Sequence, residues 1–147
     1  MINKNVYLNL KLSDFVGDQY NTIEDFTYAD VLGKSTLVGY HIIFFNRIES
    51  ELGALIINDL GDNHQLIDLA NRILKTISFD FNIGQKYSDT LTKTFGAYQY
   101  KDSVFEDITR FYFLKKDFLI ILGISDKNVL KTIEIVMDSE IIRNRMN

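Results

Sequence analysis

The stretch from Gly84 to Gly96 comes closest to a catalytic or phosphate-binding loop. Its sequence, GQKYSDTLTKTFG, opens and closes on glycine and holds two lysines, one serine, one aspartate and three threonines. A phosphate loop of the GxxxxGK[ST] type needs its second glycine directly before the lysine, so that backbone amides can close on the phosphate. Here Gln-Lys-Tyr follows Gly84 and breaks that spacing. The stretch instead predicts a short helix near 88–95, with Ser88 as its N-cap and Gly96 at its end.

The two histidines, His41 and His64, lack the neighbours that a catalytic zinc site needs. Such a site uses three protein ligands, often two of them at helical spacing with an acid nearby, and neither an H-x-x-x-H nor an H-E pattern occurs. The absence of cysteine excludes disulfides, thiolate zinc sites and cysteine nucleophiles. The segment NDLGDNHQ lacks the ligand spacing of a calcium loop. We therefore predict no metal and no cofactor.

The sequence also lacks the motifs of hydrolytic enzymes. No serine lies in a G-x-S-x-G motif, and the serines fall near the ends of predicted elements, where they favour caps and turns. Acid pairs such as Glu24–Asp25 and Glu106–Asp107 are expected by chance among 20 acidic residues. Glycosidase-type catalysis needs two acids about 5–10 Å apart across a cleft, which their order along a chain does not establish. We predict no catalytic residue and expect the chain not to be an enzyme.

The negative charge lies in the first part of the chain. Residues 1–60 hold eight acids and four bases, and so carry the whole net charge of −4. From Ser13 to Gly33 there are five acids and no base. Such a surface repels nucleic acid and membrane headgroups and attracts basic partners. The basic set Arg110, Lys115 and Lys116 is small and adjoins acids, which predicts a charged strand edge and turn instead of a nucleic-acid site.

The acidic stretch SDFVGDQYNTIEDFTYAD, residues 13–30, also carries aromatic side chains. Tyrosine and phenylalanine are favoured anchors at protein interfaces, and acids around them steer a basic protein into contact. The alternative is that Phe15 and Phe26 fill the core while the acids are only hydrated. The predicted partner-binding residues are Asp14, Phe15, Asp18, Tyr20, Glu24, Asp25, Tyr28 and Asp30.

Length and composition predict one domain spanning residues 1–147, because 46% hydrophobic and 24% charged residues are typical of globular proteins. The first residues hold no apolar stretch of signal-peptide length. The longest apolar run, Phe118–Ile124, is far shorter than the ~20 residues that cross a bilayer as a helix. We expect a cytoplasmic protein without a membrane span. The abundance of Asn, Lys and Ile and the lack of proline and tryptophan indicate an AT-rich bacterial genome.

Hydrophobic periodicity predicts an α+β fold with an antiparallel sheet of five or six strands. Apolar and polar residues alternate over Val6–Leu12, which predicts a strand, and two further strands are predicted at 35–46 and 52–59. The segments DITRFYFL, DFLIILGI and VLKTIEIVMD predict a closing β-meander, whose fully apolar middle segment indicates a central strand.

One main amphipathic helix is predicted at about 62–78. Asp62 is a suitable N-cap, and apolar residues then recur at helical spacing. Shorter helices are predicted near 22–32, where Gly33 could end the helix, and near 88–95. The last segment, SEIIRNRMN, predicts a short helix or a frayed tail.

A small, acidic, cysteine-free chain with an α+β pattern and no catalytic motif resembles the immunity proteins of interbacterial toxin systems, including contact-dependent inhibition. The layout of its second half, IGQKYSDTLTKTFG followed by the meander, is similar to that of many such proteins. No functional residue is carried over by position. The resemblance implies a non-enzymatic stoichiometric inhibitor of one cognate toxin, often a basic nuclease, whose active site or substrate groove it occludes.

Two alternatives stay open. A structural or phage-derived domain could assemble with itself through an uncovered sheet edge such as Val6–Leu12, giving a homo-oligomer. A small-ligand-binding protein could instead use a pocket between sheet and helix, lined by residues such as Tyr40, Phe44 and Tyr112.

Overall fold

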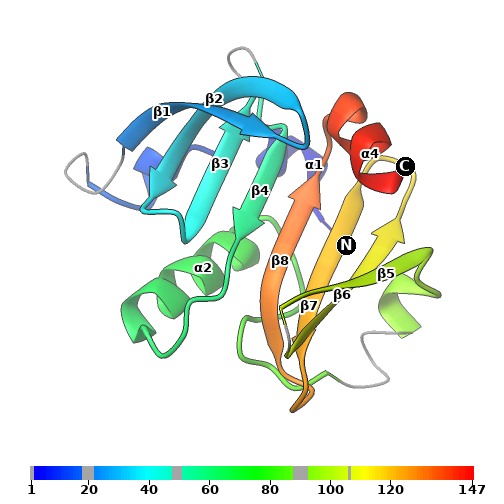
Figure 1. Cartoon of the computed structure of the whole chain (residues 1–147). Coiled ribbons are helices and arrows are strands. Elements are labelled where there is room, and N and C mark those ends of the chain that lie inside the picture. The colour runs from blue at the N-terminus through cyan, green and yellow to red at the C-terminus, as the bar shows by residue number, and fades with distance from the viewer. Residues whose placement is uncertain (1, 18–21, 48–50, 88–92, 106) are drawn as a thin grey trace.

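In the computed structural model, the chain forms one eight-stranded antiparallel sheet with short helices beside it (Figure 1). The structure describes residues 2–17, 22–47, 51–87, 93–105 and 107–147. The strands are β1 (Thr22–Tyr28), β2 (Val31–Val38), β3 (Ile42–Asn46), β4 (Ala54–Ile57), β5 (Tyr100–Phe105), β6 (Ile108–Leu114), β7 (Leu119–Ser125) and β8 (Leu130–Val136).

The sheet consists of two four-stranded meanders that meet in its middle. Its strand order is β1-β2-β3-β4-β8-β7-β6-β5, and every neighbouring pair is antiparallel. Antiparallel neighbours need only short connections, so each meander follows the chain directly. The last strands of the two meanders, β4 and β8, therefore lie side by side, while the first strands, β1 and β5, form the two edges.

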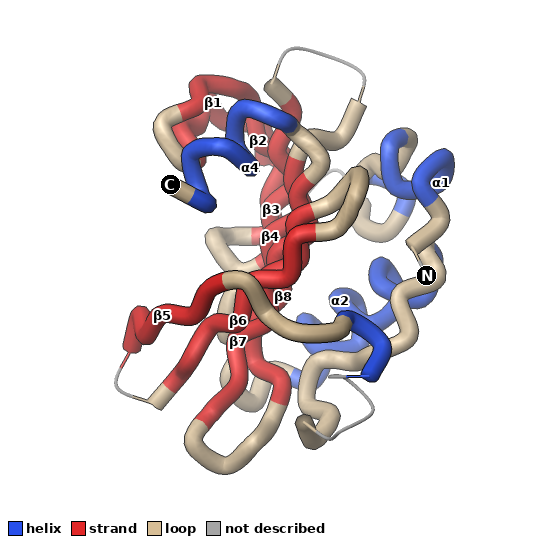
Figure 2. The backbone as a smooth tube through the Cα atoms, turned by 90° about the vertical axis from the view of Figure 1, so that its right-hand side faces the viewer, coloured by secondary structure: helices blue, strands red, loops and turns tan. Residues whose placement is uncertain are grey.

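Helices lie on both sides of the sheet (Figure 2). On one side are α1 (Lys4–Leu8) and α2 (His64–Thr76), and on the other is α4 (Ser139–Met146). The N-terminus of α2 is capped by Asn63, whose side-chain oxygen accepts a hydrogen bond from the backbone N–H of Leu66 at 3.1 Å. We call the side with α1 and α2 the helix-covered face, and the side with α4 the inner face.

The largest apolar core lies on the helix-covered face, where α2 buries Leu69, Ala70, Ile73 and Leu74. Strand residues such as Phe44 and Leu55 belong to the same core. Because successive side chains of a strand point to opposite faces, the neighbours of these residues pack on the inner face. Strands β3, β4 and β7 are consequently buried on both faces over almost their whole length.

The predicted fold class, five or six strands with one main amphipathic helix, is wrong. The chain is α+β, but its described residues form eight strands and only short helices. The segment predicted to be helical near 22–32 is the hairpin of β1 and β2, whose turn residues Ala29 and Asp30 have φ values of 50° and 65°. Two consecutive positive φ values match a tight two-residue hairpin turn, here built without the usual glycine.

Gly33, predicted to end a helix, lies inside β2 instead. A Cβ atom at this position would come within 2.5 Å of the Phe45 ring, so glycine allows the ring to pack directly against the strand. The strand predicted at 35–46 is likewise divided, since Gly39 with φ of 55° turns the chain between β2 and β3. Like β1, the strand β5 was not predicted from the sequence.

The strand predicted at Val6–Leu12 is also wrong, because α1 and the 3-10 turn η1 (Leu12–Asp14) occupy this region. Asn3 caps α1 by accepting a hydrogen bond from the backbone N–H of Val6 at 3.2 Å. The buried Tyr7 hydroxyl donates to the carbonyl of Ile135 at 2.6 Å and so fixes α1 to the sheet. The alternating apolar residues here pack a helical turn against the sheet. They do not form a strand of the sheet.

The closing meander is confirmed, as β6, β7 and β8 lie in the three predicted segments. β7 is buried at every position and lies between the other two, as its unbroken apolar run predicted. α2 lies within the range predicted as 62–78. Of the helix predicted near 88–95, residues 88–92 lie outside the described residues. No helix in the described part of the chain is long and apolar enough to cross a membrane.

Candidate functional site

The eight residues predicted to bind a partner fall in different places. Asp14 and Phe15 lie at the end of η1, where Arg72 of α2 donates a hydrogen bond from Nη2 to the carbonyl of Phe15 at 3.5 Å. Phe15 is half-buried against the core of the helix-covered face, which favours the core alternative for this ring. Asp18 and Tyr20 lie outside the described residues.

The remaining four residues, Glu24, Asp25, Tyr28 and Asp30, belong to the β1–β2 hairpin. Alternation along β1 turns Glu24 and Tyr28 towards the inner face and Asp25 towards the opposite, outer face of the hairpin, while Asp30 lies in the turn. The acidic stretch thus contributes to two separate surfaces.

One surface is the outer face of the hairpin, formed by Ile23, Asp25, Thr27, Leu32 and Lys34, which we name the hairpin surface. All five side chains are exposed, and Ile23 and Leu32 are 68% and 71% accessible. Between these two apolar side chains, Lys34 Nζ lies 2.7 Å from Asp25 Oδ1 across the strand pair. The hydrogen bond from Lys34 and the positive charge of Lys34 lower the pKa of Asp25. The hairpin surface thus leaves two large apolar side chains in contact with water on either side of a charged pair.

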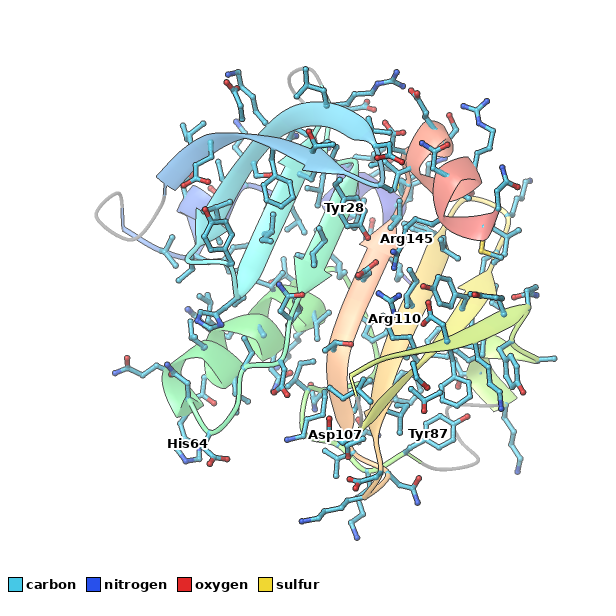
Figure 3. The ribbon with its side chains drawn as sticks, in the orientation of Figure 1. Tyr28, His64, Tyr87, Asp107, Arg110 and Arg145 are labelled. Carbon is cyan, nitrogen blue, oxygen red and sulfur yellow. The ribbon has the colours of Figure 1, made fainter. Side chains whose placement is uncertain are left out.

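The second surface is a polar cluster on the inner face that joins strands of both meanders (Figure 3). Tyr28 of β1 donates a hydrogen bond to Oε2 of Glu134 in β8. Three strands, β2, β3 and β4, separate β1 from β8 in the sheet, so these side chains meet only because the sheet curls. Figure 1 shows the β1–β2 hairpin arching towards α4.

Arg145 of α4 lies at the centre of this cluster. Its Nη2 donates to Glu134 Oε2 at 3.1 Å and to Tyr112 Oη at 3.2 Å. Its guanidinium carbon lies 5.8 Å from the ring centre of Tyr28 and 5.5 Å from that of Tyr112, within the range of cation–π contacts. Glu134 lies opposite isoleucines of β4 and β7, and its side chain is only 13% exposed. A carboxylate in that position needs such partners, because desolvation without them is costly.

Asp102, Arg110 and Tyr112 form the other half of the cluster. Arg110 binds Asp102 through two hydrogen bonds, from Nε to Oδ1 at 2.9 Å and from Nη2 to Oδ2 at 2.7 Å. This forked geometry is the strongest arrangement of an arginine and a carboxylate. Tyr112 donates to Asp102 Oδ2 at 3.0 Å and accepts from Arg145, so its hydroxyl connects the two halves.

The proton positions follow from burial and charge. Hydrogen bonds from Arg110 hold the pKa of Asp102 below its ordinary value of 3.8. Burial raises the pKa of Tyr112 to about 12. Burial, followed by the nearby Glu134 carboxylate, raises the pKa of Tyr28 well above 10.0. At neutral pH both phenols therefore keep their protons and remain hydrogen-bond donors to carboxylates.

A pocket of about 340 Å³ lies beside this cluster, bounded by the β1–β2 turn, β5, β6 and the last turn of α4. We call it the inner pocket. Its polar lining includes Asp30, Tyr100, Asp102, Arg110, Tyr112 and Arg145. Charged and hydrogen-bonding side chains prevail there, so the pocket suits a polar or charged group.

Other sequence predictions stay separate from this site. The small-ligand pocket predicted around Tyr40, Phe44 and Tyr112 does not form, because Tyr40 is exposed in a turn, Phe44 lies on the helix-covered face and Tyr112 on the inner face. His64 begins α2, far from the cluster (Figure 3).

Sequence reasoning assigned none of the four charged members of the cluster, Asp102, Arg110, Glu134 and Arg145, to a site. Arg110 was expected at a strand edge, but β6 lies between β5 and β7. Arg145 lies in the segment predicted as a short helix or a frayed tail, which forms the helix α4. The available signal was Glu134 itself, a lone acid between Ile133 and Ile135 in a strand that begins and ends with apolar residues.

Among the described residues, no three histidine or acidic side chains gather where they could hold a metal ion. The cluster pairs each carboxylate with an arginine, which leaves no unpaired acid next to a free base within it. Comparison of the chain with protein-family models, with curated proteins and with solved structures finds no match.

Proposed function

We propose that this chain is a non-enzymatic protein that binds and neutralises a basic protein toxin, as do the immunity proteins that its sequence resembles. The observation that carries the proposal is the exposure of Ile23 and Leu32, 68% and 71%, on one face of an acidic edge hairpin. Two large apolar side chains in water favour association, because a partner that covers them removes apolar area from contact with water.

The charge of the hairpin suits a basic partner. Residues 22–38 hold three acids, Glu24, Asp25 and Asp30, and one base, Lys34. On the hairpin surface itself Asp25 is paired with Lys34, so the excess acids are Glu24 on the inner face and Asp30 in the turn. The resulting net negative charge of the whole hairpin raises the association rate with a positively charged protein, and this contribution falls as salt is added. The apolar anchors then determine how slowly the complex dissociates.

The position of the hairpin adds a second mode of contact. β1 is the first strand in the sheet order and has one described neighbour, β2. An edge strand presents backbone N–H and C=O groups to which a strand of another protein can pair. An inhibitor could use this edge to hold a toxin in one orientation while the hairpin surface covers it.

The test is affinity capture with the tagged chain, with Ile23→Asp/Leu32→Asp as the binding variant and Leu114→Asp as the control. Leu114 is also exposed, 41%, but lies on β6 near the opposite edge of the sheet. We expect the wild type and the control to retain one basic protein in equimolar amount, less at high salt, and the binding variant to lose it. The captured protein must also be toxic to cells that lack this chain.

Self-association is the outcome that contradicts the proposal. If the wild type forms a stable oligomer in solution and the Ile23→Asp/Leu32→Asp variant is monomeric, the hairpin surface binds a second copy of the chain. Capture of the same protein by wild type and binding variant would also refute the assigned surface.

A further inference from the structure

We propose that Tyr28, Tyr112 and Glu134 form a binding site for a guanidinium group, in which Arg145 of α4 is an internal occupant that an arginine side chain of a protein partner can replace. We call these three residues the cage. The cage residues come from β1, β6 and β8, and none of them belongs to the hairpin surface. This inference and the proposed function therefore rest on different residues, and each can fail alone.

The geometry of the cage matches the recognition of an arginine. The Arg145 guanidinium carbon lies 5.8 Å and 5.5 Å from the centres of two tyrosine rings, and Nη2 donates to the Glu134 carboxylate at 3.1 Å. Aromatic rings together with a carboxylate are the surroundings that proteins use to hold planar cations. The hydroxyl of Tyr112 supplies a further acceptor at 3.2 Å.

The charge balance specifies the kind of ligand. Arg110 and Arg145 together neutralise Asp102 and Glu134, with separations of 2.7 Å for Arg110–Asp102 and 3.1 Å for Arg145–Glu134. Removal of Arg145 would leave Arg110 as the one cation that pairs with both Asp102 and Glu134 among the described residues, at 2.7 Å and 4.0 Å, and Glu134 is only 13% exposed. A second cation restores neutrality there, whereas an anion would add to an uncompensated buried charge.

Arg145 does not satisfy all of its own donors in this position. Its Nε is buried and has no hydrogen-bond partner among the described residues, and a guanidinium in another orientation would not carry this free-energy cost. The side chain is also 20% exposed and lines the inner pocket, so the cage is reached from solvent on that side.

The attachment of α4 permits such a replacement. Asp138 caps its first turn, because Asp138 Oδ1 accepts a hydrogen bond from the backbone N–H of Ile141. The side chain of Ile141 is fully buried. The last turn is held by Arg145 and by a hydrogen bond from Asn144 Nδ2 to the carbonyl of Ala29 at 2.8 Å. It is also held by Met146, which is partly buried against the apolar cluster of the inner face. The last turn can unwind when these contacts are released, while Ile141 keeps the rest of the helix in place.

The experiment measures binding of N-acetyl-arginine amide to the wild type and to Arg145→Ala by titration calorimetry and by NMR. N-acetyl-citrulline amide, which has the same shape without the charge, is the control ligand. Arg143→Ala, on the same helix, is the control protein. The double variant Arg145→Ala/Glu134→Gln removes the carboxylate, and Arg145→Ser, whose short polar side chain also leaves the cage open, replaces the alanine variant if that one does not fold.

We expect Arg145→Ala to bind N-acetyl-arginine amide at least about tenfold more tightly than the wild type, since a charged pair with ring contact is worth a factor of this order. Citrulline should not bind, the Glu134→Gln double variant should lose binding, and Arg143→Ala should behave as wild type. A folded Arg145 variant that binds arginine no better than the wild type, or binds citrulline equally well, would overturn the proposal.

Discussion

Both faces of the sheet bury apolar side chains, but among the described residues the inner face adds a network of charged and hydrogen-bonded side chains. On the helix-covered face, α2 and the strands bury aliphatic and aromatic side chains, with Phe44, Leu55 and Ile73 at most 1% exposed. On the inner face, two arginines, two carboxylates and two tyrosines connect β1, β5, β6, β8 and α4. Apolar packing is non-directional and depends on volume, whereas the cluster depends on each individual partner.

Replacement of Phe44 by alanine tests the helix-covered face and should have the largest effect. We expect a loss of about 3–5 kcal/mol in the free energy of unfolding, because the substitution removes buried apolar area and leaves a cavity. Urea unfolding measures it. Tyr40→Ala, at an exposed ring, is the control and should change stability by less than about 1 kcal/mol. Equal effects of the two substitutions would contradict the comparison of the faces.

Replacement of Glu134 by glutamine tests the inner face. The substitution keeps the shape but removes the charge that pairs with Arg145, and we expect a loss of about 1–3 kcal/mol. A double-mutant cycle with Arg145→Ala isolates the interaction of the two side chains. If the effects of the two single substitutions simply add, the cluster is a set of independent contacts, and the contrast between the faces disappears.

A third prediction concerns acid. The pKa of Asp102 is lowered in the folded protein, chiefly by hydrogen bonds from Arg110, so folding favours the ionised carboxylate. The stability that this group contributes is present above its unfolded pKa, close to 3.8, and is lost as the pH falls through the lower folded value. Asp102→Asn should therefore be less stable than the wild type at neutral pH, and the difference should shrink below pH 4. A difference that is constant with pH would show that the Asp102 carboxylate does not gain from its charge.

The comparison of the two meanders shows what the sequence could predict. β6, β7 and β8 lie where apolar runs and short polar turns predicted them, because strong periodicity over seven residues determines a strand. β1 was missed because two adjacent acids, Glu24 and Asp25, interrupt its apolar residues and because its turn, Ala29–Asp30, contains no glycine. Gly33 then suggested a helix end, although packing against Phe45 is what requires glycine there.

The inner cluster was not predicted, for a physical reason. Tyr28 and Asp30 were predicted as partner-binding residues, and the structure places them at the cluster and the inner pocket. Their partners could not be chosen, because Tyr28 and Glu134 are 106 positions apart and meet through the curl of the sheet. Sequence spacing predicts neighbours within a strand or helix, whereas this contact depends on strand order and curvature.

Substitutions on the hairpin surface should have the smallest effect on the free energy of unfolding. They therefore distinguish a role in binding from a role in stability. Ile23 and Leu32 are exposed, so replacing each with aspartate should change the free energy of unfolding by less than about 0.5 kcal/mol. Urea unfolding of the double variant tests this, with Leu114→Asp as the matched substitution near the other edge. Loss of partner capture at unchanged stability would show that these side chains serve association, since they contribute nothing to the fold. A large loss of stability would instead mean that the hairpin surface is covered within the chain, and it would remove the main support for the proposed interface.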